Sequence, residues 1–193
     1  MPLISVKVDG FSIAAISTDG LEAVTINVGG ACIEDEYADL TASGGIYSGS
    51  TADHRIWVDH VALRAGQVVE VDFLELGTPN GDYRAAANPT RDPGDPIPSY
   101  GFDLFAEART APRLRSGYRV RLTRNEGDPI TLTTNSDDHG FGFHILWNKM
   151  RPGNVSVSLE SYSLESVESE TAGRGTFRER VKVGSNYRLE LLA

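Results

Sequence analysis

Four histidines fall in two short stretches of the sequence. Histidine can act both as a metal ligand and as an acid–base group, so these side chains are candidates for either role. His54 and His60 are six residues apart, so on a strand they share a face but lie about 20 Å apart. His139 and His144 are five apart and face opposite ways, unless a neighbouring glycine forms a bulge. Neither stretch alone predicts a metal site. A site that draws one histidine from each stretch stays open, against surface or hydrogen-bonded histidines.

Four carboxylates form the second group of interest, because Glu34, Asp35, Glu36 and Asp39 fall within six residues. Residues 31–53 around them have no clean period and include a Gly/Ser-rich run, so we predict a long loop with at most one helical turn. A cluster of one sign attracts an oppositely charged partner. We therefore expect these four residues to bind a partner; the alternative is a surface that only maintains solubility.

Other catalytic signatures are missing from the sequence. It contains no G-x-S-x-G, Walker, G-x-G-x-x-G or H-E-x-x-H motif. Cys32 is the single cysteine, which excludes an intrachain disulfide and favours a small buried residue over a thiol nucleophile. We therefore assign no catalytic residue and no cofactor and favour a non-enzymatic protein, with an enzyme of unrecognised type built around one of the four histidines as an open alternative.

A basic stripe lies in the second half of the chain. It allows three interpretations: docking on the acidic first half within the chain or between copies, contact with an anion, or protection of an exposed strand edge. The stripe consists of five arginines, Arg113, Arg115, Arg119, Arg121 and Arg124.

The elements that position these side chains are predicted to be strands, because apolar residues alternate with polar ones and no segment sustains a helical period. Turn-forming pairs such as Asp9-Gly10 and Asp19-Gly20 separate them. This pattern predicts an all-β protein, either a β-sandwich or two packed small β units. The expected strands cover residues 4–8, 12–16, 24–28, 55–63, 68–76, 119–122, 130–132, 143–147, 155–159, 176–183 and 187–191.

The two halves of the chain follow a similar plan. A turn at Gly66 precedes one alternating strand, and it lies 42 positions after Val24 in an earlier strand. A turn at Gly184 precedes another alternating strand, and it lies 41 positions after Phe143 in an earlier strand. We interpret this as an internal duplication, with two unrelated halves that share generic patterns as the alternative. The predicted organisation is a first β unit at 1–76, a Pro-rich connector at 77–117 and a second β unit at 118–193.

The charge is not shared between these units. Residues 1–76 hold 12 acidic and 3 basic side chains, whereas the connector has 5 of each and residues 118–193 have 10 of each. The whole net charge of −9 therefore lies in the first unit. Such acidity argues against a general binder of nucleic acids or anionic membranes.

The functional hypothesis is a protein that binds a basic protein partner through its acidic first half, for example a bacterial inhibitor of the immunity-protein type. A carbohydrate- or metal-binding β-sandwich that uses the connector and its aromatic neighbours is the alternative. A homo-oligomer stays open. With no signal segment and no apolar run of about 18 residues, the cytoplasm is the expected location.

Overall fold

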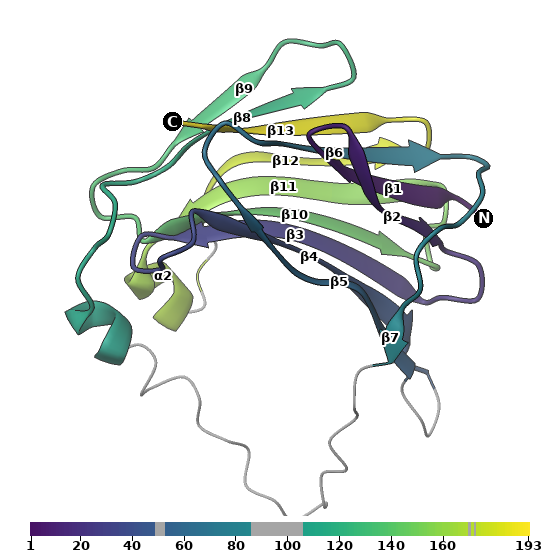
Figure 1. The fold of residues 1–193 in the computed structure, drawn as a ribbon, viewed down its shortest axis with the longest axis horizontal. Coiled ribbons are helices and arrows are strands. Elements are labelled where there is room, and N and C mark those ends of the chain that lie inside the picture. Colours follow the sequence, from purple (N-terminus) through teal and green to yellow (C-terminus); the bar gives the residue numbers. More distant parts are fainter. Residues whose placement is uncertain (49–52, 86–105, 170, 172) are drawn as a thin grey trace, which may run out of the picture.

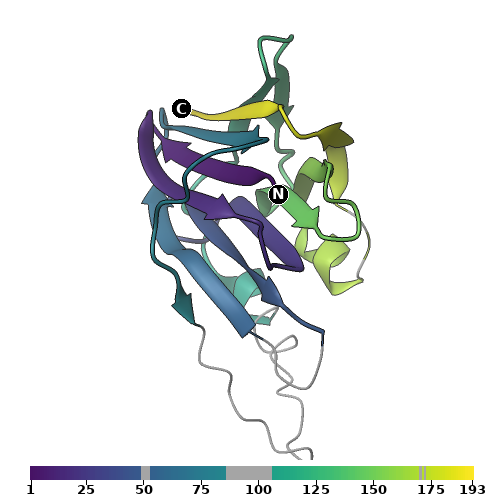
Figure 2. The same cartoon turned by 90° about the vertical axis from the view of Figure 1, so that its right-hand side faces the viewer.

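Two antiparallel sheets packed face to face form the fold, so the predicted β-sandwich is confirmed (Figures 1 and 2). The computed structural model describes residues 1–48, 53–85, 106–169, 171 and 173–193. Sheet A has the strand order β2-β1-β6-β13-β8-β9, and sheet B has the order β12-β11-β10-β3-β4-β5-β7. The strands of sheet A are β1 Leu3–Val8, β2 Phe11–Ser17, β6 Val68–Leu74, β8 Arg119–Arg124, β9 Ile130–Thr133 and β13 Asn186–Leu192. Those of sheet B are β3 Ala23–Ala31, β4 Ala38–Ile46, β5 Asp53–Leu63, β7 Arg84–Ala85, β10 Gly140–Asn148, β11 Asn154–Tyr162 and β12 Arg174–Lys182.

The core lies between the sheets and is built by the alternation seen in the sequence. In β3, every second residue from Val24 is buried, and the residues between them face outward. Trp147 on β10 is fully buried and donates its indole N–H to the carbonyl of Pro152, 3.1 Å away. The alternating pattern thus places large apolar side chains between the layers and leaves the polar set on the outer faces.

The two halves have the same topology. From its centre outward, sheet A contains β6, β1 and β2 from the first half and β13, β8 and β9 from the second. Sheet B likewise contains β3, β4 and β5 on one side of its centre and β10, β11 and β12 on the other. The central pairs, β6–β13 and β3–β10, are antiparallel. The arrangement therefore has the pseudo-two-fold symmetry that a duplicated unit produces, and both halves share one core.

The turns at Gly66 and Gly184 occupy equivalent places in this plan. Gly66 lies between β5 and β6, and Gly184 between β12 and β13, so each turn carries the chain from sheet B to sheet A. Both glycines have positive φ, 89° and 98°, a conformation that glycine adopts without steric cost. Neither turn closes a hairpin, because the strands that it joins lie in different layers.

The prediction that residues 31–53 form a long loop is wrong, because β4 crosses this segment beside β3. Its inward positions are mostly small; a Cβ at Gly44 would lie only 2.3 Å from the carbonyl oxygen of Ala23. Alanine and glycine at the inward positions differ little in hydrophobicity from the residues at the outward positions. The alternation that predicts a strand is therefore not visible in this part of the sequence. Asp39 consequently stands on a strand, paired with Gly29 of β3, and not in a loop.

Little helix accompanies the sheets. A short helix, α2 (Leu164–Glu168), follows β11, and residues 106–110 are also helical. In the part of the chain that the structure describes, no helix has the length and hydrophobicity needed to cross a bilayer. About half of the Pro-rich connector, residues 86–105, lies outside the described residues, and the proposed unit boundaries stay a prediction.

Candidate partner-binding site

The acidic hairpin, residues 32–37, joins β3 to β4 at one end of sheet B and is held from behind by Arg115. The Arg115 guanidinium donates to the carbonyl oxygens of Ala31, at 2.7 Å, and Asp35, at 3.1 Å. It also lies 5.6 Å from the ring centres of both Tyr37 and Tyr118. These contacts use the backbone of the hairpin and leave its carboxylates available.

Two tyrosines complete this support. The Tyr37 hydroxyl donates to the carbonyl of Leu192, at 2.7 Å, and the Tyr118 hydroxyl donates to that of Ala31, at 2.8 Å. The two rings meet edge to face with their centres 5.2 Å apart. The hairpin and the end of β3 are therefore tied to the end of β13 and to the segment before β8.

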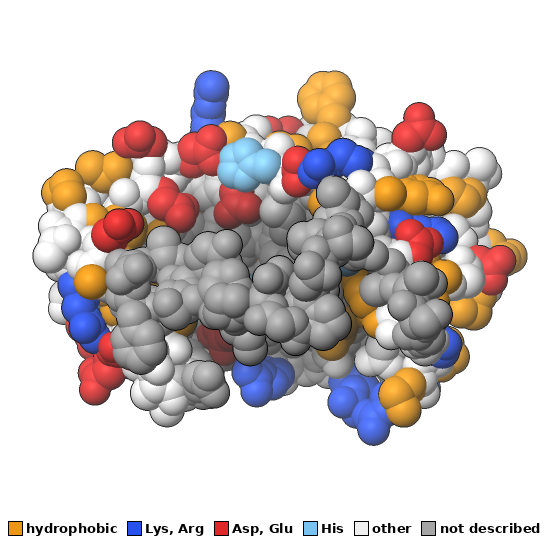
Figure 3. Space-filling view, turned by 90° about the horizontal axis from the view of Figure 1, so that it is seen from below, with side chains coloured by type: hydrophobic (Ala, Val, Ile, Leu, Met, Phe, Trp, Pro, Cys, Tyr) orange, Lys and Arg blue, Asp and Glu red, His pale blue; other side chains and the backbone are white. Residues whose placement is uncertain are grey.

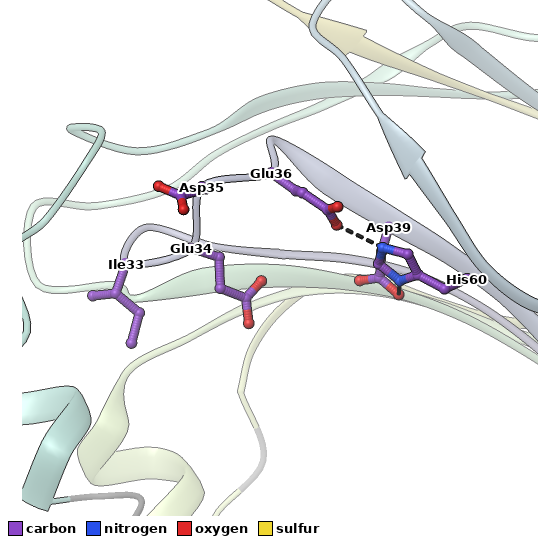
Figure 4. A pocket seen from close by; sticks show the side chains of 6 residues that line it. All are labelled: Ile33, Glu34, Asp35, Glu36, Asp39 and His60. Atoms are coloured by element: carbon purple, nitrogen blue, oxygen red, sulfur yellow. Dashed lines mark hydrogen bonds and ion pairs between the residues drawn. The ribbon is translucent and has the colours of Figure 1, made fainter.

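All four carboxylates predicted to bind a partner line one hollow of about 660 Å³, together with Ile33 and His60. The imidazole of His60 lies 2.6 Å from a carboxylate oxygen of Glu36 and 3.8 Å from one of Asp39. Figure 4 shows Glu34, Glu36 and Asp39 extending toward this hollow, whereas the side chain of Asp35 is directed away from them. The structure thus brings Glu36 and Asp39 together around one histidine, while Glu34 lines the same hollow farther away.

Asp39 is the member of this group with a perturbed acidity. Burial raises the pKa of its carboxyl above the ordinary value, and the neighbouring Glu36 adds to this, while His60 acts in the opposite direction. Its side chain is 34% exposed. An ionised Asp39 is therefore less well solvated than a free carboxylate, and a cation that enters the hollow would relieve that cost.

Several charges on the outer face of sheet A are paired. The outer face of sheet A carries ion pairs between neighbouring strands, at 2.9, 3.0 and 3.2 Å. They are Lys7–Asp72, Arg188–Glu70 and Arg121–Glu190.

Around the acidic hairpin the pattern is different. Among the described residues no lysine or arginine forms an ion pair with Glu34, Asp35, Glu36 or Asp39; His60 lies close to Glu36 and Asp39. Figure 3 shows acidic side chains gathered around a histidine on this face of the molecule. At this end of sheet B, Glu34 and Asp35 therefore form no ion pair with another described residue.

The histidines do not form a metal centre in the part of the chain that is described. His54 bonds the Tyr47 hydroxyl at 2.8 Å, at the other end of β5 from His60. His139 accepts a bond from the backbone N–H of Leu164, and His144 lies 3.0 Å from the side-chain oxygen of Asn27. No three His, Cys, Asp or Glu side chains among these residues converge as metal ligands would.

Cys32 is buried beneath the hairpin. Its sulfur accepts a bond from the Arg113 guanidinium, at 3.3 Å, and burial raises the pKa of its thiol. A thiol held protonated in this way is a poor nucleophile. Cys32 therefore serves as a small core residue.

The predicted arginine stripe is divided among several contacts. Arg113 and Arg115 do dock on the first half, but through Cys32 and backbone carbonyls, as described above. Arg121 and Arg124 pair with Glu190 and Glu179 of the second half. The stripe therefore does not neutralise the acidic cluster.

A second hollow, of about 230 Å³, adjoins the first and shares Glu34 and Asp39 with it. It lies over the outer face of β3 and β10, where Asn27, His144 and Tyr162 line it. These residues are far apart in the sequence, and only the pairing of β3 with β10 brings them together. The only available signal was the run of small and polar residues at the outward positions of β3.

Comparison of the chain with family models, curated proteins and solved structures finds no match. Function must therefore be inferred from this site's residues and their geometry.

Proposed function

We propose that the protein binds a basic protein partner through the acidic hairpin and the adjoining residue Asp39. The observation that carries the proposal is the single hollow lined by four carboxylates, none of which forms an ion pair with a lysine or arginine among the described residues. Complementary charge of this kind accelerates association and selects against acidic partners. An inhibitor of the immunity-protein type is one protein that works in this way.

Rigidity of the hairpin supports the same function. Arg115, Tyr37 and Tyr118 hold its backbone, so binding would cost little ordering of the chain. A hairpin that served only solubility would not need this support, because surface charge acts without a fixed geometry.

Charge reversal with a matched control tests the proposal. The variant Glu34→Lys/Asp35→Lys/Glu36→Lys and the control Asp19→Lys/Glu75→Lys/Glu126→Lys change the net charge equally, at exposed positions. Each protein is used to capture partners from cells, and the dissociation constant of the purified partner is then measured. We expect the control to retain a basic partner that the hairpin variant loses. A set of captured proteins that is unchanged by reversal of the hairpin would refute the proposal.

The polar outer face of sheet B supports one other candidate, a carbohydrate ligand. Thr25, Thr41, Ser43, Ser156 and Ser158 occupy outward positions there and provide hydroxyl groups for hydrogen bonds. A rise in melting temperature with a neutral oligosaccharide, and none with a basic peptide, would favour this candidate.

A further inference from the structure

The smaller hollow has a floor of two glycines from neighbouring strands. Gly142 of β10 pairs directly with Gly29 of β3, and Gly29 pairs on its other side with Asp39 of β4. The lack of side chains at these two positions lowers the surface between the flanking groups. Glycine inside a strand weakens it and often marks close approach of a ligand or another backbone.

Packing within the protein does not explain Gly29. A Cβ at that position would meet only the carbonyl oxygen of Phe141, at 3.5 Å, which is an ordinary contact. Its φ is also outside the region that favours glycine. At Gly142, by contrast, a Cβ would lie 2.4 Å from Nε2 of His144, whose ring leans over the floor. The glycine at position 29 therefore keeps open a space that the fold would allow a side chain to fill.

The walls of the hollow present acceptors. Although His144 is partly open to solvent, desolvation by the groups packed around its ring lowers its pKa, so the imidazole is neutral near pH 7. With Nδ1 donating to Asn27, as their 3.0 Å separation indicates, Nε2 is left as an acceptor above the floor. The carboxylates of Glu34 and Asp39 add acceptors and negative charge.

Tyr162 supplies an aromatic wall. Its ring lies across Gly140, since a Cβ there would be 2.4 Å from the hydroxyl oxygen, and burial raises the pKa of that hydroxyl to about 12. Among the residues that line the hollow there is no lysine or arginine. The complementary ligand is a planar cation with several N–H donors, which is the description of a guanidinium group. An ammonium group is a compact, strongly hydrated point charge and matches this arrangement less well.

We propose that this hollow binds the guanidinium group of one arginine side chain. The inference rests on the proposed function, because that arginine would come from the basic partner held by the acidic hairpin. Glu34 and Asp39 line both hollows, so the arginine pocket and the hairpin surface are continuous.

Titration with single amino-acid amides tests the pocket. N-acetyl-arginine amide and N-acetyl-lysine amide carry the same charge, and NMR shifts of the Gly29 and Gly142 amides report the site. We expect saturable shifts with the arginine compound and affinity at least about fivefold weaker with the lysine compound.

The variant Gly29→Leu should abolish the shifts at Gly142, whereas Gly153→Leu, which adds the same side chain where no atom lies within 4 Å, should retain them. Asp39→Asn provides a second, isosteric variant that should weaken arginine binding without filling the pocket.

Equal affinity for the arginine and lysine compounds would contradict the proposed arginine pocket. Undiminished binding of the arginine compound by Gly29→Leu would contradict it as well. An oligolysine peptide separates this failure from failure of the proposed function. Binding of that peptide by both wild type and Gly29→Leu, with loss in the hairpin charge-reversal variant, supports the hairpin surface independently. If the peptide binds and the arginine compound does not, only the pocket is wrong. If neither binds wild type, both proposals are wrong.

Discussion

Two hairpins that are equivalent in the fold carry opposite charges. Residues 32–37 join β3 to β4, and residues 149–153 join β10 to β11, so each connects the central strand of sheet B in its half to the next strand outward. The first contains Glu34, Asp35 and Glu36, whereas the second contains Lys149 and Arg151. Because one topology accommodates both, acidity at the first hairpin is not a requirement of the fold.

The hairpins also differ in how their charge is balanced. Lys149 donates to the carboxylate of Glu22, which additionally accepts bonds from Tyr47 and Ser48. The acidic hairpin has no comparable ion pair with lysine or arginine among the described residues. The basic hairpin thus has its lysine in an ion pair, while the carboxylates of the acidic hairpin have no lysine or arginine partner among the described residues.

Removal of the support behind the acidic hairpin should have the largest effect. Arg115→Ala removes the donor to the carbonyl of Asp35 and one of the donors to the carbonyl of Ala31, and we expect the free energy of unfolding to fall by about 2 kcal/mol. Urea denaturation measures this loss. The matched change in the other hairpin, Arg151→Ala, removes an exposed side chain and should alter stability by less than about 0.5 kcal/mol. Equal losses in both variants would mean that the hairpins are supported alike.

Breaking the anchor of the basic hairpin should have a smaller, pH-dependent effect. Bonds from Lys149, Ser48 and Tyr47 lower the pKa of Glu22 from 4.5 to about 2. Its contribution to stability is therefore full above pH 4.5 and is lost as the pH falls toward 2.

Melting temperatures of wild type and Glu22→Gln between pH 7 and pH 2 test this contribution. We expect the variant to be less stable at pH 7, with the difference shrinking to zero at the acidic end. Glu75→Gln, at an exposed site, is the control. A difference that stays constant across the range would show that the ionisation of Glu22 is not what stabilises the hairpin.

Asp39→Asn should produce the smallest change in stability, and it should be a gain. Because the pKa of Asp39 is raised in the folded protein, the fold binds its proton more tightly than the unfolded chain does, and stability falls as the pH rises through this range. The amide removes that penalty at pH 7 and makes no difference below the ordinary pKa. Thermal denaturation at pH 7 and pH 3 checks the sign; a variant less stable than wild type at pH 7 would show that Asp39 is stabilised by its neighbours.

Much of the fold follows from the sequence, because large apolar residues alternate with other residues in the strands of both sheets. Ile4 and Val6, or Phe143 and Ile145, predict buried strand faces without reference to a structure. β4 was missed because its inward residues include Ala42 and Gly44, which are too small to give the pattern. Close packing against β3 selects these small residues, and only the pairing of the strands reveals that contact.

The candidate site was predictable only in part. Proximity in sequence identified Glu34, Asp35 and Glu36, but His60 comes from β5 and His144 from β10. Strand order and register decide which of these side chains meet, and neither can be read from local patterns. The same limit applies to the glycine floor, where Gly29 and Gly142 are 113 residues apart in the chain and directly paired in the sheet.

An exchange of charge between the two hairpins tests the central claim most directly. The double variant Glu34→Arg/Arg151→Glu keeps the net charge at −9 and moves one charge of each sign to the opposite hairpin. Its dissociation constant for a peptide of alternating arginine and lysine is measured beside that of wild type. If the acidic hairpin is the binding surface, the constant should rise at least about tenfold. Equal affinity of the two proteins would show that overall acidity, and not this hairpin, attracts the basic partner.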